Sequence, residues 1–63
     1  MKMEEMKSYI YEKKKEIEED IKKAKEMIRV AREMGFSVAE LEAELNKYES
    51  QLRRIERVLE KYK

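Results

Sequence analysis

The C-terminal part of this 63-residue chain carries an apolar repeat that restricts what it can fold into. From Val38 to Tyr62, uncharged apolar side chains recur at alternating steps of three and four residues. The stripe consists of Val38, Leu41, Leu45, Tyr48, Leu52, Ile55, Leu59 and Tyr62. A mean step of about 3.5 residues keeps one face of an α-helix in contact with a second helix. We therefore predict a helix at about residues 38–62 that packs its stripe against a partner helix.

Residues 2–34 supply that partner, because they form a second segment with helical periodicity. One position of its heptad repeat is occupied by Met3, Ile10, Ile17, Ala24 and Ala31, and the companion position by Ile21 and Ile28. Nearer the N-terminus the companion position holds Lys7 and Lys14, whose methylene stems can lie on the seam. We predict one long helix at about residues 2–34, with its best packing between Ile17 and Ala31.

A stop signal and a start signal for helices lie side by side at residues 35–40. Gly35, the only glycine, suits the left-handed conformation that closes a helix, and Phe36 can make the accompanying apolar contact. Ser37 and Glu40 have the spacing of a capping box, in which each side chain bonds a backbone amide near the start of a helix. These residues predict a tight turn at 35–37. The alternative is one continuous bent helix with Gly35 in its interior.

A short turn between two helices makes them antiparallel neighbours. The predicted fold is therefore all-α, with residues 1–63 forming a single antiparallel helical hairpin, a two-helix coiled coil. The predicted seam contains Ile10, Ile17, Ile21, Ala24, Ile28, Ala31, Val38, Leu41, Leu45, Tyr48, Leu52, Ile55 and Leu59. Lys25 and Arg32 should face Glu42 and Glu49 across one flank of it.

The composition bears on how such a hairpin is stabilised. A chain this short has a marginal core, and without cysteine or histidine neither disulfides nor soft-metal sites can stabilise it. Regular helix packing and self-association remain as the ways in which the hairpin can be stabilised. The high share of Lys and Glu, with one Gln, one Asn and no Cys, is typical of hyperthermophile proteins and of idealised designs, so we expect a thermostable chain. No apolar run approaches a signal peptide or a membrane span, and we expect a soluble, cytoplasmic protein.

Several apolar residues lie off the predicted seam. Met27, Val30 and Met34 form a second stripe on the first helix and, with Phe36, place apolar surface near the turn. Met3, Met6 and Tyr62 do the same at the open end. One interpretation is that the turn residues fold over Phe36. The other is that these residues form an interface with a second copy, most simply a dimer of hairpins forming a helical bundle, or with a partner helix.

The sequence offers little for catalysis. Without His or Cys there is no histidine base or cysteine nucleophile, and one glycine cannot build a phosphate-binding loop. We expect a non-enzymatic protein without cofactor, metal or small-molecule substrate. Its expected function is protein–protein interaction or scaffolding through self-association.

Two alternative functions remain open. A basic stripe on the first helix, with Lys15, Lys22, Lys25, Arg29 and Arg32, could contact nucleic acid, although the net charge of +1 opposes this. The chain could also be a coiled-coil fragment of a larger protein.

Overall fold

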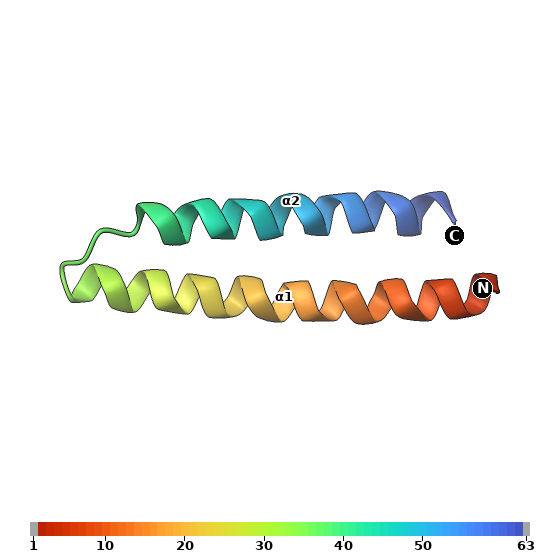
Figure 1. Ribbon diagram of the computed structural model, residues 1–63, viewed down its shortest axis with the longest axis horizontal. Helices are drawn as coiled ribbons and strands as arrows, with labels where there is room; N and C mark the ends of the chain where they lie inside the picture. Colours follow the sequence, from red (N-terminus) through yellow and green to blue (C-terminus); the bar gives the residue numbers. More distant parts are fainter. Residues whose placement is uncertain (1, 63) are drawn as a thin grey trace.

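The computed structural model describes residues 2–62, which form two antiparallel helices joined by one connection (Figure 1). Helix α1 spans Met3–Glu33 and helix α2 spans Ala39–Lys61. The prediction of an all-α antiparallel hairpin is confirmed. The expected bounds of the helices differ from the observed ones by a single residue at each end, and the terminal residues of the predicted domain, Met1 and Lys63, lie outside the described part.

The molecule is a narrow rod of 49 × 15 × 15 Å. Helix α1 is the longer of the two and projects past α2 at both ends (Figure 1). Because the connection at residues 34–38 is not helical, α2 begins further back along α1 than a tight turn would place it. In residues 2–62, neither helix is long and apolar enough to cross a bilayer.

Helix α1 ends in a Schellman motif at Gly35. Gly35 has φ +81°, in the left-handed region. Its backbone N–H donates to the Arg32 carbonyl at 3.0 Å, and the Phe36 N–H donates to the Ala31 carbonyl at 2.9 Å. These bonds satisfy carbonyls that the last turn of a helix leaves without partners. The chain therefore reverses at its single glycine and does not continue as one bent helix.

The predicted capping box at the start of α2 is wrong. The N-cap residue is Val38, and no side chain forms a cap hydrogen bond there. The first helical bond runs from the Glu42 N–H to the Val38 carbonyl at 2.8 Å. Val38 is half-buried as the first residue of the seam, whereas Ser37 stays exposed in the connection. Starting the helix one residue later places Ser37 and Glu40 outside the positions that a capping box requires.

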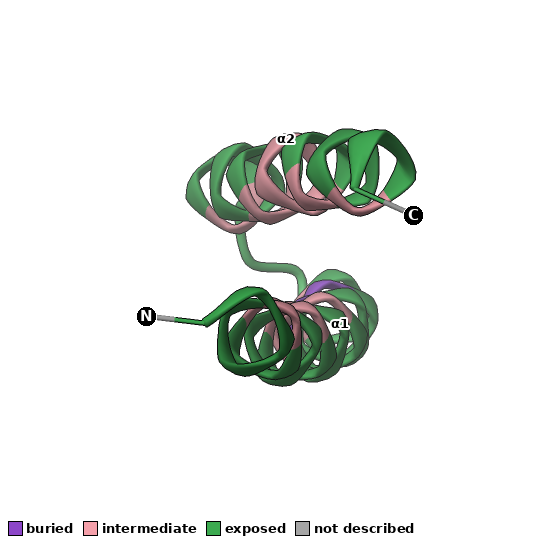
Figure 2. Ribbon diagram, turned by 90° about the vertical axis from the view of Figure 1, so that its right-hand side faces the viewer, coloured by how far each residue is buried: buried purple, intermediate pink, exposed green. Residues whose placement is uncertain are grey.

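Every predicted seam residue lies buried or half-buried between the helices. Ala24 and Ile28 are buried, at 6% and 7% exposed, and within residues 2–62 no other apolar side chain is buried to this degree. Lys7 and Lys14 are half-buried as well, as expected for lysines on a seam. The pink and purple ribbon on the facing sides of α1 and α2 shows that the core is one layer thick (Figure 2).

One ion pair between the helices supports the antiparallel register on one flank of the seam. Nη2 of Arg32 on α1 lies 3.3 Å from Oε2 of Glu42 on α2, as the sequence predicts. Lys25 and Glu49, expected on the same flank, take part in none of the ion pairs within 4 Å that residues 2–62 form. Because the Arg32–Glu42 pair is exposed, it adds less than about 1 kcal/mol and selects orientation more than it stabilises.

Candidate interaction surface

The turn end of the hairpin carries a group of exposed apolar side chains that we call the turn patch: Met27, Val30, Met34 and Phe36. Their exposed fractions are 56%, 40%, 62% and 61%. With Ala31 and Leu41 they line an open groove of about 290 Å³, in which Glu26 is the single charged lining residue. The interpretation in which the methionines fold over Phe36 is wrong, because Phe36 remains largely exposed beside them.

Helix geometry explains why the turn patch faces solvent. Each residue advances about 100° around the helix axis, so Met27 points about 100° away from the buried Ile28. Val30 lies still further around the helix. A hairpin has one facing helix, and that helix can cover a single stripe. The second stripe therefore has no partner among the described residues, although its side chains are as apolar as those of the seam.

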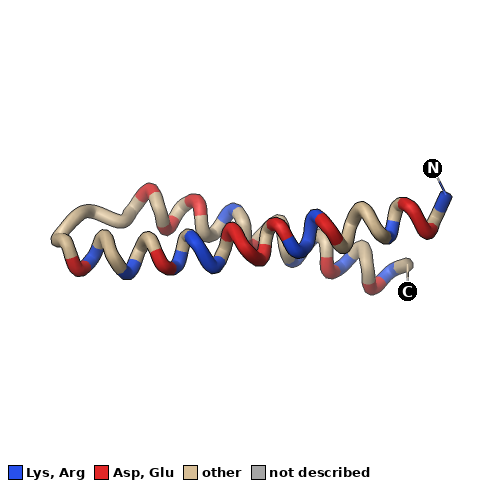
Figure 3. The backbone as a smooth tube through the Cα atoms, turned by 90° about the horizontal axis from the view of Figure 1, so that it is seen from below, with Lys and Arg blue, Asp and Glu red and all other residues tan. Residues whose placement is uncertain are grey.

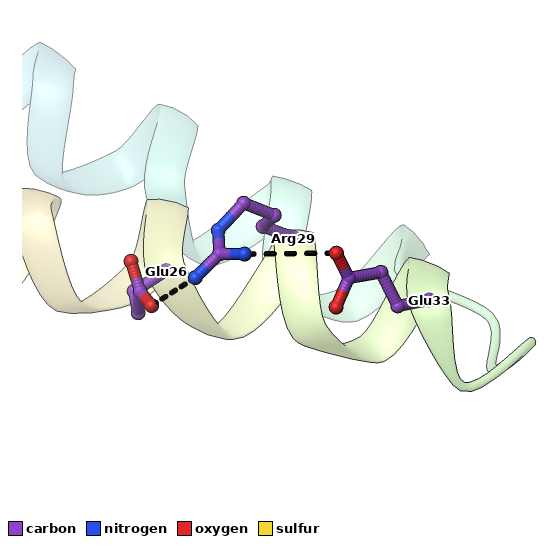
Figure 4. Close-up of polar contacts among 3 residues, drawn as sticks. All are labelled: Glu26, Arg29 and Glu33. Atoms are coloured by element: carbon purple, nitrogen blue, oxygen red, sulfur yellow. Dashed lines mark hydrogen bonds and ion pairs between the residues drawn. The ribbon is translucent and has the colours of Figure 1, made fainter.

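The charged residues beside the turn patch are largely paired with each other. Arg29 reaches back to Glu26 and forward to Glu33, whose Oε1 lies 3.6 Å from Arg29 Nη1 (Figure 4). Glu26 is thus the rim residue of the groove and also a partner of Arg29. This pairing leaves little net charge at the border of the patch.

The open end shows a different arrangement. Met3, Met6 and Tyr62 are exposed, as expected for interface residues, but they lie at the opposite end of the rod from the turn patch. Met3 and Met6 continue the seam side of α1 toward the N-terminus, close to where α2 ends. Tyr62, which closes the predicted stripe, is the C-cap residue of α2 and is exposed. The structure therefore divides the predicted interface residues into two separate groups.

The predicted interface did not include Tyr9, Tyr11 or Val58, which are also exposed apolar or aromatic residues. Tyr9 precedes Met27 by 18 residues, five full turns of helix, so the two share one face of α1. The 18-residue spacing from Met27 is the sequence signal that could have placed Tyr9 on the same exposed face. The Lys13 ammonium lies 5.5 Å from the Tyr9 ring, a distance suited to a cation–π contact.

The basic stripe is interleaved with carboxylates. Arg29 and Arg32 form ion pairs with acidic residues, whereas Lys15, Lys22 and Lys25 are exposed. Both blue and red segments occur along each helix (Figure 3). The groove beside Lys25, Arg29 and Arg32 is also lined by Glu33 and Glu42, so both signs of charge meet there.

In residues 2–62, no three acidic side chains converge closely enough to hold a metal ion. Comparisons of the chain with models of known protein families, with curated proteins and with solved structures gave no match.

Proposed function

We propose that this chain is a non-enzymatic interaction module that self-associates through its apolar surfaces. The observation that carries the proposal is the turn patch, where four large apolar side chains are between 40% and 62% exposed around one groove. Scattered single apolar residues on a surface are ordinary, but a contiguous group without charge is typical of an interaction site.

The thin core supports the same proposal. Two buried apolar side chains in residues 2–62 are few for a folded domain, and the seam residues around them keep part of their surface in water. Burying a large apolar side chain contributes about 1.5–3 kcal/mol, so covering even half-exposed residues on a second copy is a substantial gain for a marginal hairpin. Association then contributes to stability as any ligand of the folded state does.

The nucleic-acid alternative gains no support from the arrangement of charge. Its two arginines, Arg29 and Arg32, already contact carboxylates of the same chain. Binding a phosphate backbone would require breaking those ion pairs and placing the neighbouring glutamates close to phosphates. A self-associating hairpin requires neither change.

Sedimentation equilibrium tests the proposal directly. Between about 10 µM and 1 mM, a range that covers weak protein–protein affinities, we expect the average mass to rise from 7.7 kDa toward twice that value. Because the contact is apolar, the association should persist in about 1 M salt, which screens charge pairs. A single 7.7 kDa species over the whole range would contradict self-association.

A further inference from the structure

We infer, on the basis of the proposed self-association, that the second copy docks turn end to turn end and not along the full length of the rod. Two copies would cross antiparallel over the last two turns of α1, about a two-fold axis between Val30 and Ala31. The charged residues that border the turn patch on the same face of α1 favour this geometry over the others.

Toward the N-terminus, the face of α1 that carries the turn patch becomes acidic. Glu16 and Asp20 precede Met27 by 11 and 7 residues, which places them within about 20° of it around the helix axis. Glu12 and Glu19 precede Val30 by 18 and 11 residues and share its angular position equally well. We call Glu12, Glu16, Glu19 and Asp20 the acidic strip. Asp20 is half-buried and the other three are exposed.

The patch and the strip are continuous. Met27 lines a shallow groove together with Glu19, Lys22, Lys23 and Glu26, so the apolar surface passes directly into charged surface within one turn of helix. Three lysines offset part of the negative charge of the strip: Lys13 lies 3.4 Å from a Glu16 oxygen, and Lys22 and Lys23 line the groove beside Met27. Four carboxylates against these three ammonium groups still leave this part of the face with a net negative charge.

The acidic strip opposes any full-length packing through this face. In a parallel side-by-side dimer, the acidic strip of one copy lies against the acidic strip of the other. In a fully overlapped antiparallel dimer the midpoint of Met3–Glu33 falls at residue 18, so residues 12–20 of one copy lie against residues 16–24 of the other. Both arrangements bring like charges together at an interface, which costs several kcal/mol in general.

Turn-to-turn docking avoids that repulsion and pairs apolar side chains with apolar side chains. With the axis between Val30 and Ala31, Met27 of one copy lies opposite Met34 of the other, because 27 and 34 are equidistant from the axis. Such an isologous contact uses the same patch twice, as a two-fold dimer requires. The acidic strips then extend away from the interface in opposite directions.

The size of the patch sets the strength of this dimer. Four large side chains at roughly half exposure present on the order of 400 Å², so two patches bury about 800 Å², below the range of stable interfaces. A weak, reversible and elongated dimer is the expected result.

Distances between spin labels test this geometry, and the absence of cysteine allows each label to be placed at one site. We choose Glu40→Cys near the turn and Glu5→Cys near the open end, both at exposed positions. Turn-to-turn docking predicts a Glu40–Glu40 label distance below about 35 Å and a Glu5–Glu5 distance near 75 Å, since about 25 residues of helix separate Glu5 from the axis in each copy.

A matched pair of variants provides the second arm. Val30 on α1 and Val58 on α2 are 40% and 38% exposed, and lysine favours helix at both positions. Val30→Lys places two like charges beside the axis and should weaken dimerisation at least about tenfold, whereas Val58→Lys should change it less than about twofold. Circular dichroism should show unchanged helix content in both.

Each outcome of these experiments either supports or overturns turn-to-turn docking. A short distance between the labels at position 40, together with dimerisation that is weakened by Val30→Lys and not by the control variant, supports the inference. A dimer whose open-end labels are close, or whose two label pairs give similar distances, overturns turn-to-turn docking while self-association stands. A dimer that tolerates Val30→Lys overturns it too. A chain that stays monomeric at 1 mM overturns the inference and the proposed function together.

Discussion

At the scale of single residues, the reversal of the chain depends on Gly35. Its φ of +81° lies where a side chain is disfavoured, but nothing lies within 4 Å of the position that a Cβ atom would take. Any penalty on substitution therefore comes from the backbone conformation and not from a steric clash.

We predict that Gly35→Ala lowers the free energy of unfolding by about 1–2 kcal/mol, the penalty for a left-handed residue with a Cβ atom. Urea denaturation followed by circular dichroism measures the change. Gly35→Asn is the control and should lose less, because asparagine tolerates this conformation better. Equal stability of Gly35→Ala and the parent chain would show that the turn does not hold the left-handed conformation.

Substitution of Ser37, in contrast to that of Gly35, should cost little stability. It has the sequence signature of an N-cap but forms no cap hydrogen bond, since α2 begins after Val38. We predict that Ser37→Ala changes the free energy of unfolding by less than about 0.5 kcal/mol, as for an ordinary surface position. A loss near 1 kcal/mol in the same denaturation experiment, typical of a removed N-cap, would mean that Ser37 caps the helix after all.

At the scale of the helices, stability concentrates at the centre of the seam. Ile28 is 7% exposed, whereas Met27, the preceding residue on the same helix, is 56% exposed. The two side chains are similarly large. Substituting each in turn therefore compares the stability contributed by a buried position with that of an exposed position on the same helix.

We predict that Ile28→Ala lowers the free energy of unfolding by about 2–4 kcal/mol, from lost burial and the space left behind. Met27→Ala should lower it by less than about 1 kcal/mol when measured at a concentration where the chain is monomeric. Chemical denaturation of both variants provides the comparison. Similar losses for the two would contradict the assignment of Ile28 to the core and Met27 to the surface.

The helices and the seam were predictable from sequence because their signal is periodic and repeats over many residues. Thirteen seam positions were predicted from heptad spacing, and all thirteen are buried or half-buried. The role of Gly35 at the end of the first helix was equally predictable, since few positions other than a left-handed cap favour glycine. These features depend on neighbours within one or two helical turns.

The remaining features depend on how the two helices pack together. Two start positions for α2 compete, one offering a cap from Ser37 and the other seating Val38 on the seam, and only packing against α1 decides between them. The exposure of Phe36 likewise depends on where the connection runs. The division of the predicted interface into two groups required the relative position of the helix ends, which heptad spacing does not supply.

At the scale of the whole molecule, the hairpin combines a core one layer thick with an uncovered apolar surface at its turn. Folding and association should therefore be coupled. A folded state that dimerises becomes more stable as its concentration rises, because the unfolded chain does not share the interface.

Thermal unfolding over a hundredfold range of chain concentration tests this claim most directly, with helix content monitored by circular dichroism. We predict that the midpoint temperature rises steadily with concentration across the range where the dimer forms, and that Val30→Lys shifts this rise to at least about tenfold higher concentration while Val58→Lys leaves it in place. A midpoint that is independent of concentration would contradict the coupling of folding to association, because it would describe a hairpin that is complete without a second copy.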